Sequence, residues 1–188
     1  MRDPGRREQI LDAAEAVFAQ AGYHAASMDE IAERVGVGKP VLYRHFGSKD
    51  GLYAAAVERA GDQLVRRLEA VAAQRAPREQ LRAGVLAFFA FVEERRDGWV
   101  VLHRDGPAGA AAAGRLRELR ARLAATIAQL LAREPGEREE ALAHAIVGAG
   151  EALATYWVEH PSIPAEVVAS ELVELVWPGL ERLAGARV

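Results

Sequence analysis

The chain has 188 residues, of which 51% are hydrophobic and 27% charged, and its formal net charge is -3. This balance is typical of a folded globular protein, and the acidic total argues against a general polyanion binder. The absence of cysteine excludes disulfides and thiolate metal sites. No signal peptide is indicated, and charges interrupt every apolar stretch before the roughly 20 residues that a membrane span needs. We therefore expect a cytoplasmic protein.

Apolar residues recur at helical spacing through most of the sequence, which predicts an all-α fold of about nine helices. The first helix is expected to stop at Gly22. Ser27, followed by Glu30, is typical of a capping box that opens a second helix. The glycines of "GVG" at 36–38 indicate a short turn after that helix.

The next two helices follow closely. A third helix is expected from Lys39 or Pro40 to Phe46, because proline is tolerated in the first turn. Ser48 should cap a longer fourth helix. After Pro77 the pattern predicts five further helices: 77–96, 99–105, a long one that ends at about residue 130, 137–159 and 164–184. Interruptions are expected at Asp97-Gly98 and Pro135-Gly136.

The window from Arg34 to Lys49 contains no acidic residue, although the chain as a whole is acidic. Two short helices joined by glycines fit a helix-turn-helix unit, whose second helix enters the major groove of DNA. Leu42 and Phe46 lie four positions apart, so both should face the interior. The side chains expected to face outward are those of Lys39, Tyr43, Arg44 and His45. Such cations neutralise phosphates, and arginine can also pair with a guanine edge.

Residues 10–58, "ILDAAEAVFAQAGYHAASMDEIAERVGVGKPVLYRHFGSKDGLYAAAVE", resemble the N-terminal DNA-binding region of the tetracycline-repressor (TetR) family, with "LYRHFGSKDGL" as the most specific part. The resemblance implies phosphate contacts at Ser27, Tyr43, His45 and Lys49, and contacts to bases or backbone at Val37, Gly38, Lys39, Pro40 and Arg44. The chain departs from the family pattern at Pro40, Val41 and Gly51. These departures concern the operator sequence rather than the fold.

The family architecture implies a helix-turn-helix DNA-binding domain in residues 1–50 and an effector-binding and dimerisation domain in residues 51–188. It also implies a ligand-responsive transcriptional regulator, expected here to be a repressor that binds a palindromic operator as a homodimer. The expected dimer interface lies on the last two helices, whose apolar faces could instead be intramolecular core. Its candidate residues are Ala145, Gly148, Ala149, Ala152, Leu172, Val176, Trp177 and Leu180.

Aromatic residues with a few polar neighbours in the C-terminal part are candidates for a small-molecule site. They are Phe88, Phe91, Trp99, His103, Glu151, Thr155 and Tyr156. Such a set suits a mostly apolar effector, whose identity the sequence does not indicate. An ordinary helical core is the alternative interpretation, because aromatics at helical spacing also fill cores.

An enzyme is the rival class of function. The histidines, at positions 24, 45, 103, 144 and 160, show no metal-ligand spacing, and no nucleophile elbow, P-loop or dinucleotide fingerprint occurs. We therefore expect no enzymatic activity, no cofactor and no metal. A DNA-binding regulator or architectural protein without an effector remains the alternative, and a thermal shift on adding ligands would distinguish the two.

Overall fold

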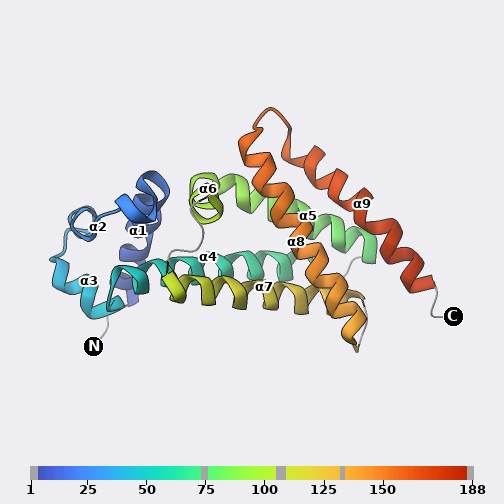
Figure 1. Cartoon of the computed structure of the whole chain (residues 1–188), viewed down its shortest axis with the longest axis horizontal. Coiled ribbons are helices and arrows are strands. Elements are labelled where there is room, and N and C mark those ends of the chain that lie inside the picture. The colour runs from blue at the N-terminus through green and yellow to red at the C-terminus, as the bar shows by residue number, and fades with distance from the viewer. Residues whose placement is uncertain (1–3, 73–75, 105–108, 132–133, 186–188) are drawn as a thin grey trace. The chain divides into compact units, whose positions relative to one another are not determined.

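The structure is a computed structural model that describes residues 4–72, 76–104, 109–131 and 134–185. Side chains are described at these positions except at 4, 71–72, 101–104, 130 and 183–185. Over the described ranges the chain forms helices and their connections without a strand (Figure 1). The prediction of an all-α fold is confirmed.

The described ranges contain nine helices, which follow the expected order closely. They are α1 (Pro4–Ala25), α2 (Met28–Val35), α3 (Lys39–Phe46), α4 (Lys49–Ala72), α5 (Pro77–Glu94), α6 (Arg96–Arg104), α7 (Gly109–Leu131), α8 (Glu137–Glu159) and α9 (Ala165–Gly185). The expected stop at Gly22 appears as a residue with φ 77° near the end of α1.

The expected interruption at Asp97-Gly98 falls two residues too late, because the break between α5 and α6 lies at Arg95. Both residues lie in the first turn of α6, which begins at Arg96. An acidic side chain in a first turn interacts favourably with the positive end of the helix dipole, so this pair begins a helix as readily as it ends one.

None of the described helices is both long and apolar enough to cross a membrane.

The chain divides into two compact units. The N-terminal unit consists of residues 1–61 and 95–117, and the C-terminal unit of residues 62–94 and 118–188. The predicted division after residue 50 falls in the first turn of α4. The beginning of α4 therefore belongs to the same unit as α1, α2 and α3.

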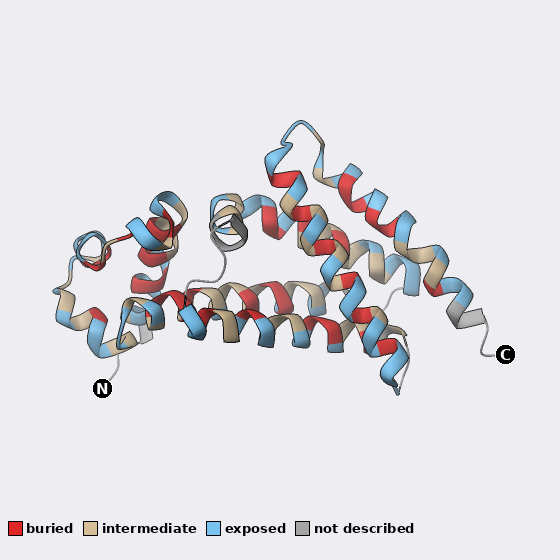
Figure 2. Ribbon diagram, in the orientation of Figure 1, coloured by how far each residue is buried: buried red, intermediate tan, exposed pale blue. Residues whose placement is uncertain are grey.

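The core of the N-terminal unit is built from the apolar faces that the helical periodicity indicates. In it α1 packs against α2 and α6, and α2 packs against α3. The side chains with no exposed surface there include Ile10, Leu11, Val17, Ile31, Leu42 and Leu52. Figure 2 shows such buried positions recurring at intervals along the helices, as expected for amphipathic segments.

The core of the C-terminal unit forms where α5, α8 and α9 pack together. Phe89 of α5 and Trp157 of α8 are fully or almost fully buried and meet edge to face, with ring centroids 5.5 Å apart. The indole nitrogen of Trp157 donates to the main-chain oxygen of Ile163 at 2.7 Å. This bond satisfies the polar atom of a buried aromatic side chain.

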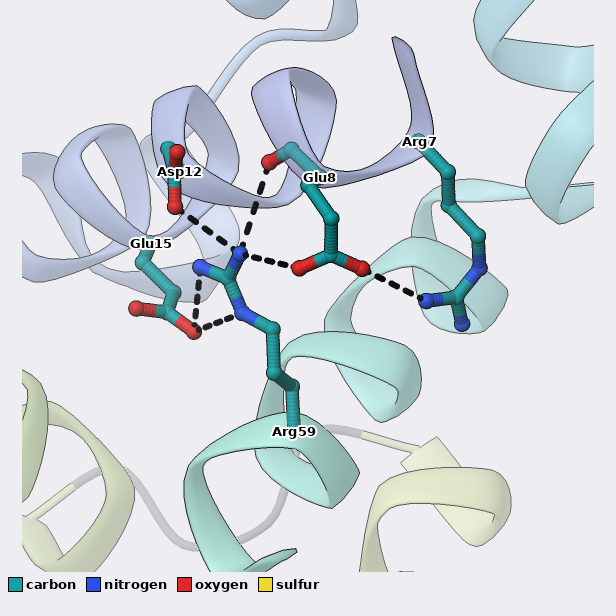
Figure 3. Close-up of polar contacts among 5 residues, drawn as sticks. All are labelled: Arg7, Glu8, Asp12, Glu15 and Arg59. Carbon is teal, nitrogen blue, oxygen red and sulfur yellow. Dashed lines mark hydrogen bonds and ion pairs between the residues drawn. The ribbon is translucent and has the colours of Figure 1, made fainter. Parts of the chain in front are cut away.

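Arg59 of α4 is bound by three carboxylates that lie on one face of α1 (Figure 3). Its guanidinium donates to Asp12 Oδ1 at 2.8 Å, to Glu15 Oε1 at 3.0 Å and to Glu8 Oε2 at 3.2 Å. Burial alone would lower the pKa of Arg59, but the hydrogen bonds to these carboxylates outweigh it and raise the pKa. These contacts tie α4 to α1.

Gly51 lies in the first turn of α4 and close to the end of α3. A Cβ atom at this position would lie 2.1 Å from the main-chain oxygen of Phe46. No side chain can occupy that distance unless one of the two helices moves. Gly51→Ala should therefore lower the free energy of unfolding by about 1–3 kcal/mol, measured by urea denaturation.

Gly98→Ala is the matched control for this substitution. Gly98 lies in the first turn of α6, as Gly51 does in α4, and a Cβ atom there would meet nothing within 4 Å. The control should be neutral or stabilise the protein by up to about 1 kcal/mol, because alanine favours helix more than glycine does. Equal stability of the two variants would contradict the close approach of α3 and α4.

Candidate nucleic-acid interface

The ends of α2 and α3 are determined by local capping. The side chain of Ser27 is the N-cap of α2 and accepts a hydrogen bond from the backbone N–H of Asp29 at 3.1 Å. Gly36 ends α2 in the left-handed conformation, with φ 72°, which glycine adopts without steric cost. Pro40 stands in the first turn of α3. The predicted cap at Ser27, the turn and the helix start are therefore confirmed, but Ser27 accepts from Asp29 rather than from Glu30, so the expected capping box is not formed.

One face of α3 is held against the core of the N-terminal unit. Leu42 is fully buried, and Phe46 and Val41 pack against the same cluster. The opposite face is left to solvent, where Tyr43 is 43% exposed and Arg44 is also exposed. The predicted orientation of α3 is confirmed, and its exposed face carries side chains suited to DNA.

The residues predicted to contact DNA all lie between the N-cap of α2 and the first residue of α4 in the N-terminal unit. Gly38, Pro40, Tyr43 and Arg44 are exposed, and Ser27, Val37, Lys39, His45 and Lys49 are half-buried. Val37 also packs against the core cluster, which leaves less of its side chain available to a base.

An ion pair places an acidic group beside the basic window. Lys39 Nζ lies 2.9 Å from Asp29 Oδ2, and this hydrogen bond raises the pKa of Lys39. Asp29 lies ten residues earlier in the chain, outside the acid-free window. In the folded protein the basic surface is therefore less positive than the sequence suggests. Arg44, by contrast, forms no ion pair with any side chain that the structure describes.

Lys49 lies at the first position of α4 and is held by groups at the end of α1. Its Nζ donates to the main-chain oxygen of His24 at 3.1 Å. The same ammonium lies 4.7 Å from the ring centroid of Tyr23, within range of a cation–π interaction. A lysine ammonium has three donors, so this arrangement leaves donors for a phosphate.

Comparison with known proteins agrees with this geometry over both units. A family model described as "Bacterial regulatory proteins, tetR family" matches residues 10–56, and one described as "Tetracyclin repressor-like, C-terminal domain" matches residues 77–179. The HTH-type transcriptional activator FasR of Mycolicibacterium smegmatis is 35% identical over 184 residues, which cover 95% of this chain and 84% of that protein. The chain belongs to the TetR family. It is a helix-turn-helix transcriptional regulator and not an enzyme.

Solved TetR-family structures share the whole fold. A TetR-like transcriptional regulator from Rhodococcus sp. RHA1 is 38% identical, with a TM-score of 0.75 over 96% of this chain and 98% of that one. A TetR-family regulator from Streptomyces coelicolor is 28% identical, with a TM-score of 0.83 over 100% of this chain and 85% of that one. The match therefore extends well beyond the DNA-binding helices.

The residues predicted to bind an effector fall in both units of this TetR-family chain. Trp99 belongs to the N-terminal unit, whereas Phe88, Phe91, Glu151, Thr155 and Tyr156 belong to the C-terminal unit. The side chain of His103 lies outside the described residues. Phe91 is buried, Phe88 and Thr155 are half-buried, and Tyr156 is exposed.

Two side chains of this set have partners outside it, of which only the Tyr156–His160 pair, four positions apart, is indicated by helical spacing. Glu151 forms a hydrogen-bonded ion pair with Arg120 of α7, at 2.8 Å and 2.9 Å. Tyr156 stacks on His160 with ring centroids 3.9 Å apart. Glu151 is therefore already paired in this structure, and a ligand group that bound it would have to compete with Arg120.

The residues predicted for the dimer interface differ in their burial. Ala145, Gly148 and Ala152 of α8 are exposed, Ala149, Val176 and Trp177 are half-buried, and Leu172 and Leu180 of α9 are buried. Two exposed apolar residues of α9 are not among the predicted ones, namely Leu175, which is 76% exposed, and Val167, which is 47% exposed. Both lie off the buried stripe of α9, a position that helical periodicity could have indicated.

The Lys39–Asp29 pair leads to a testable expectation for DNA binding. Asp29→Asn should raise the affinity for DNA of any sequence by about 2–5-fold, because Lys39 no longer shares its charge with a carboxylate. Fluorescence anisotropy with a random-sequence duplex at several salt concentrations measures the effect. Glu33→Gln is the control, since it makes the same change in charge at an exposed position of α2. An equal gain in both variants would show that net charge alone is responsible.

Proposed function

We propose that this TetR-family chain is a ligand-responsive regulator, a repressor, that binds a palindromic operator as a homodimer and is released by a small, mostly apolar effector. The observation that carries the proposal is the exposed face of α3, where Tyr43 and Arg44 project from a helix packed through Leu42. Lys39 and Lys49 add cations at the two ends of this surface. Arginine and lysine here supply phosphate contacts and base readout.

A homodimer follows from the small size of this surface. One α3 covers too few base pairs to select a site, so a two-fold pair that reads a palindrome is the expected solution. The exposed small residues Ala145, Gly148 and Ala152 would let a partner helix approach closely. Exposed Leu175 and Val167 would add apolar area on α9. Leu172 and Leu180 are buried in the protomer. They would therefore contribute indirectly, by packing α9 against its own protomer so that its exposed face is held in place.

The proposed effector site lies in the C-terminal unit. Phe88 and Phe89 meet edge to face at 5.3 Å, and a Cβ atom at Gly150 would lie 3.7 Å from Phe88, so α5 and α8 approach closely there. Aromatic side chains such as the half-buried Phe88 favour an apolar ligand, and the Arg120–Glu151 pair supplies polar groups. The ligand must bind one arrangement of the two DNA-binding units of the dimer more tightly than another. A ligand with equal affinity for both arrangements would not change their populations.

The direction of regulation has a second candidate. The FasR relative is named a transcriptional activator, which favours activation, whereas a repressor needs only to occupy its operator. A reporter gene placed downstream of the selected operator decides between the two by its expression with and without the protein. Either action on chromosomal DNA places the protein in the cytoplasm.

Selection of bound duplexes from a random DNA pool tests the proposal as a whole. The expected result is an inverted repeat whose half-sites are bound by one dimer. Sedimentation of the protein, alone and with the duplex, tests whether it is a dimer. Recovery of no enriched sequence would overturn the operator proposal, and a monomer at micromolar concentration with and without DNA would overturn the dimer. A thermal shift on adding small apolar ligands would support a sensor; a screen without a shift would favour a regulator or architectural protein without an effector.

A further inference from the structure

The position of Lys49 depends on Tyr23, a residue outside the basic window. The Lys49 ammonium lies over the Tyr23 ring at 4.7 Å and donates to the main-chain oxygen of His24 at 3.1 Å. A free lysine side chain samples many rotamers, whereas these two contacts hold the ammonium at the junction of α1 and α4. The ring of Tyr23 thus holds the Lys49 ammonium by a cation–π interaction.

Tyr23 is itself held on several sides. Its ring packs against Tyr53 at 5.2 Å and against Phe18 at 6.2 Å. Its hydroxyl donates a hydrogen bond to Asp50 Oδ1. Burial and this bond raise the pKa of Tyr23 to about 12, so the hydroxyl remains a donor at neutral pH.

Asp50 completes the arrangement from the first turn of α4. Its carboxylate lies beside the first residue of α7, where a Cβ atom at Gly109 would be 3.1 Å from Asp50 Oδ2. Asp50 therefore fixes the Tyr23 hydroxyl, and with it the plane of the ring beneath the neighbouring Lys49. The residues involved come from α1, α4 and α7, all in the N-terminal unit.

We propose that Tyr23 and Asp50 are positioning residues for a DNA phosphate contact made by Lys49. They hold the ammonium in place before DNA arrives, so that less side-chain freedom is lost on binding. This inference rests on the proposed function, in which Lys49 binds the operator backbone. It extends the determinants of DNA affinity to residues that need not touch DNA.

A double-mutant cycle tests the inference, with the full chain and an operator duplex obtained by selection from a random pool. The variants are Tyr23→Leu, Lys49→Ala and the double substitution, and the measurement is the dissociation constant at several salt concentrations. Tyr23→Leu should weaken binding by about 3–10-fold. It should also flatten the salt dependence by up to about 0.9 in log–log slope for each phosphate that is no longer neutralised. In the Lys49→Ala background the same substitution should have no further effect, because it acts through Lys49.

Further variants separate positioning from general stability. Ile10→Ala is the control, since Ile10 is fully buried in the same core cluster but is not one of the aromatic neighbours that hold the Tyr23 ring. It should lower the unfolding midpoint and leave the salt slope unchanged at a temperature well below unfolding. Tyr23→Phe retains the ring and removes the bond to Asp50, so it should fall between wild type and Tyr23→Leu.

The possible results distinguish this inference from the proposed function. Equal loss of affinity from Tyr23→Leu in the presence and absence of Lys49 would overturn the positioning role. An unchanged salt slope in Lys49→Ala would overturn both the Lys49 contact and the inference. The proposed function would still stand in that case if the operator were bound through the exposed face of α3.

Discussion

Replacing Lys39, Tyr43 and Arg44 together by alanine should lower operator affinity by at least about 100-fold. The two cations contribute phosphate contacts or base readout, and removing either of them should reduce affinity by roughly a factor of ten. Tyr43 and Arg44 are exposed, and Leu42 holds α3 to the core independently of them, so the variant should fold normally. Binding is measured by anisotropy with the selected operator, and folding by circular dichroism and thermal denaturation.

The control for this variant removes the same charge elsewhere. Arg66 and Arg82 are exposed residues of α4 and α5 in the C-terminal unit. Their double alanine substitution should change operator affinity by less than about threefold, because these arginines lie outside the unit that carries the DNA-facing residues and salt screens long-range interactions. A folded triple variant with wild-type operator affinity would show that α3 does not carry DNA binding. A loss of the same size in the control would attribute the effect to net charge.

Arg59→Met should lower the free energy of unfolding by about 2–3 kcal/mol. The Arg59 side chain is only 11% exposed and neutralises carboxylates of Glu8, Asp12 and Glu15. Methionine fills much of the same space but leaves Asp12 and Glu15 without this cation, whereas Glu8 keeps its ion pair with Arg7 at 3.5 Å. Two of the three carboxylates are well exposed, so the loss should be smaller than for a fully buried pair. Thermal denaturation should show a midpoint lowered by about 5–10 °C.

Salt and a second substitution identify the cause of this loss. Repulsion between carboxylates is screened, so the deficit of Arg59→Met should shrink between about 0.1 and 1 M NaCl. Adding Asp12→Asn should restore part of the stability. Arg122→Met is the control, because Arg122 makes an exposed ion pair with Asp62 at 2.6 Å and should cost at most about 1 kcal/mol. Equal losses in the two arginine variants would contradict the role of the carboxylate cluster.

Much of the DNA-binding unit could be predicted from the sequence because its signals are local. The Ser27 cap, the turn at Gly36 and the start of α3 depend on residues within a few positions of one another. The periodicity that places Leu42 inside and Arg44 outside is equally local. The family pattern added the interpretation of the exposed face, since short basic helices also occur in ordinary bundles.

The C-terminal unit could be predicted less completely, although its helix bounds are close to the expected ones. Leu172 and Leu180 are predicted at a dimer interface, yet they are buried in the protomer, whereas exposed Leu175 is not among the predicted residues. An apolar stripe indicates that a helix face is covered. It does not indicate whether another helix of the same chain or a second protomer covers it.

The sequence by itself determined the class of fold, the order of the helices and the unit that reads DNA, because these follow from short-range periodicity, capping and a local motif. Only the tertiary structure decided which charges meet. Asp29 pairs with Lys39 across ten residues, and Arg120 pairs with Glu151 across 31. Tyr23 supports Lys49 from another helix. Such pairs depend on the distance between elements in space, and no pattern along a single helix records that distance.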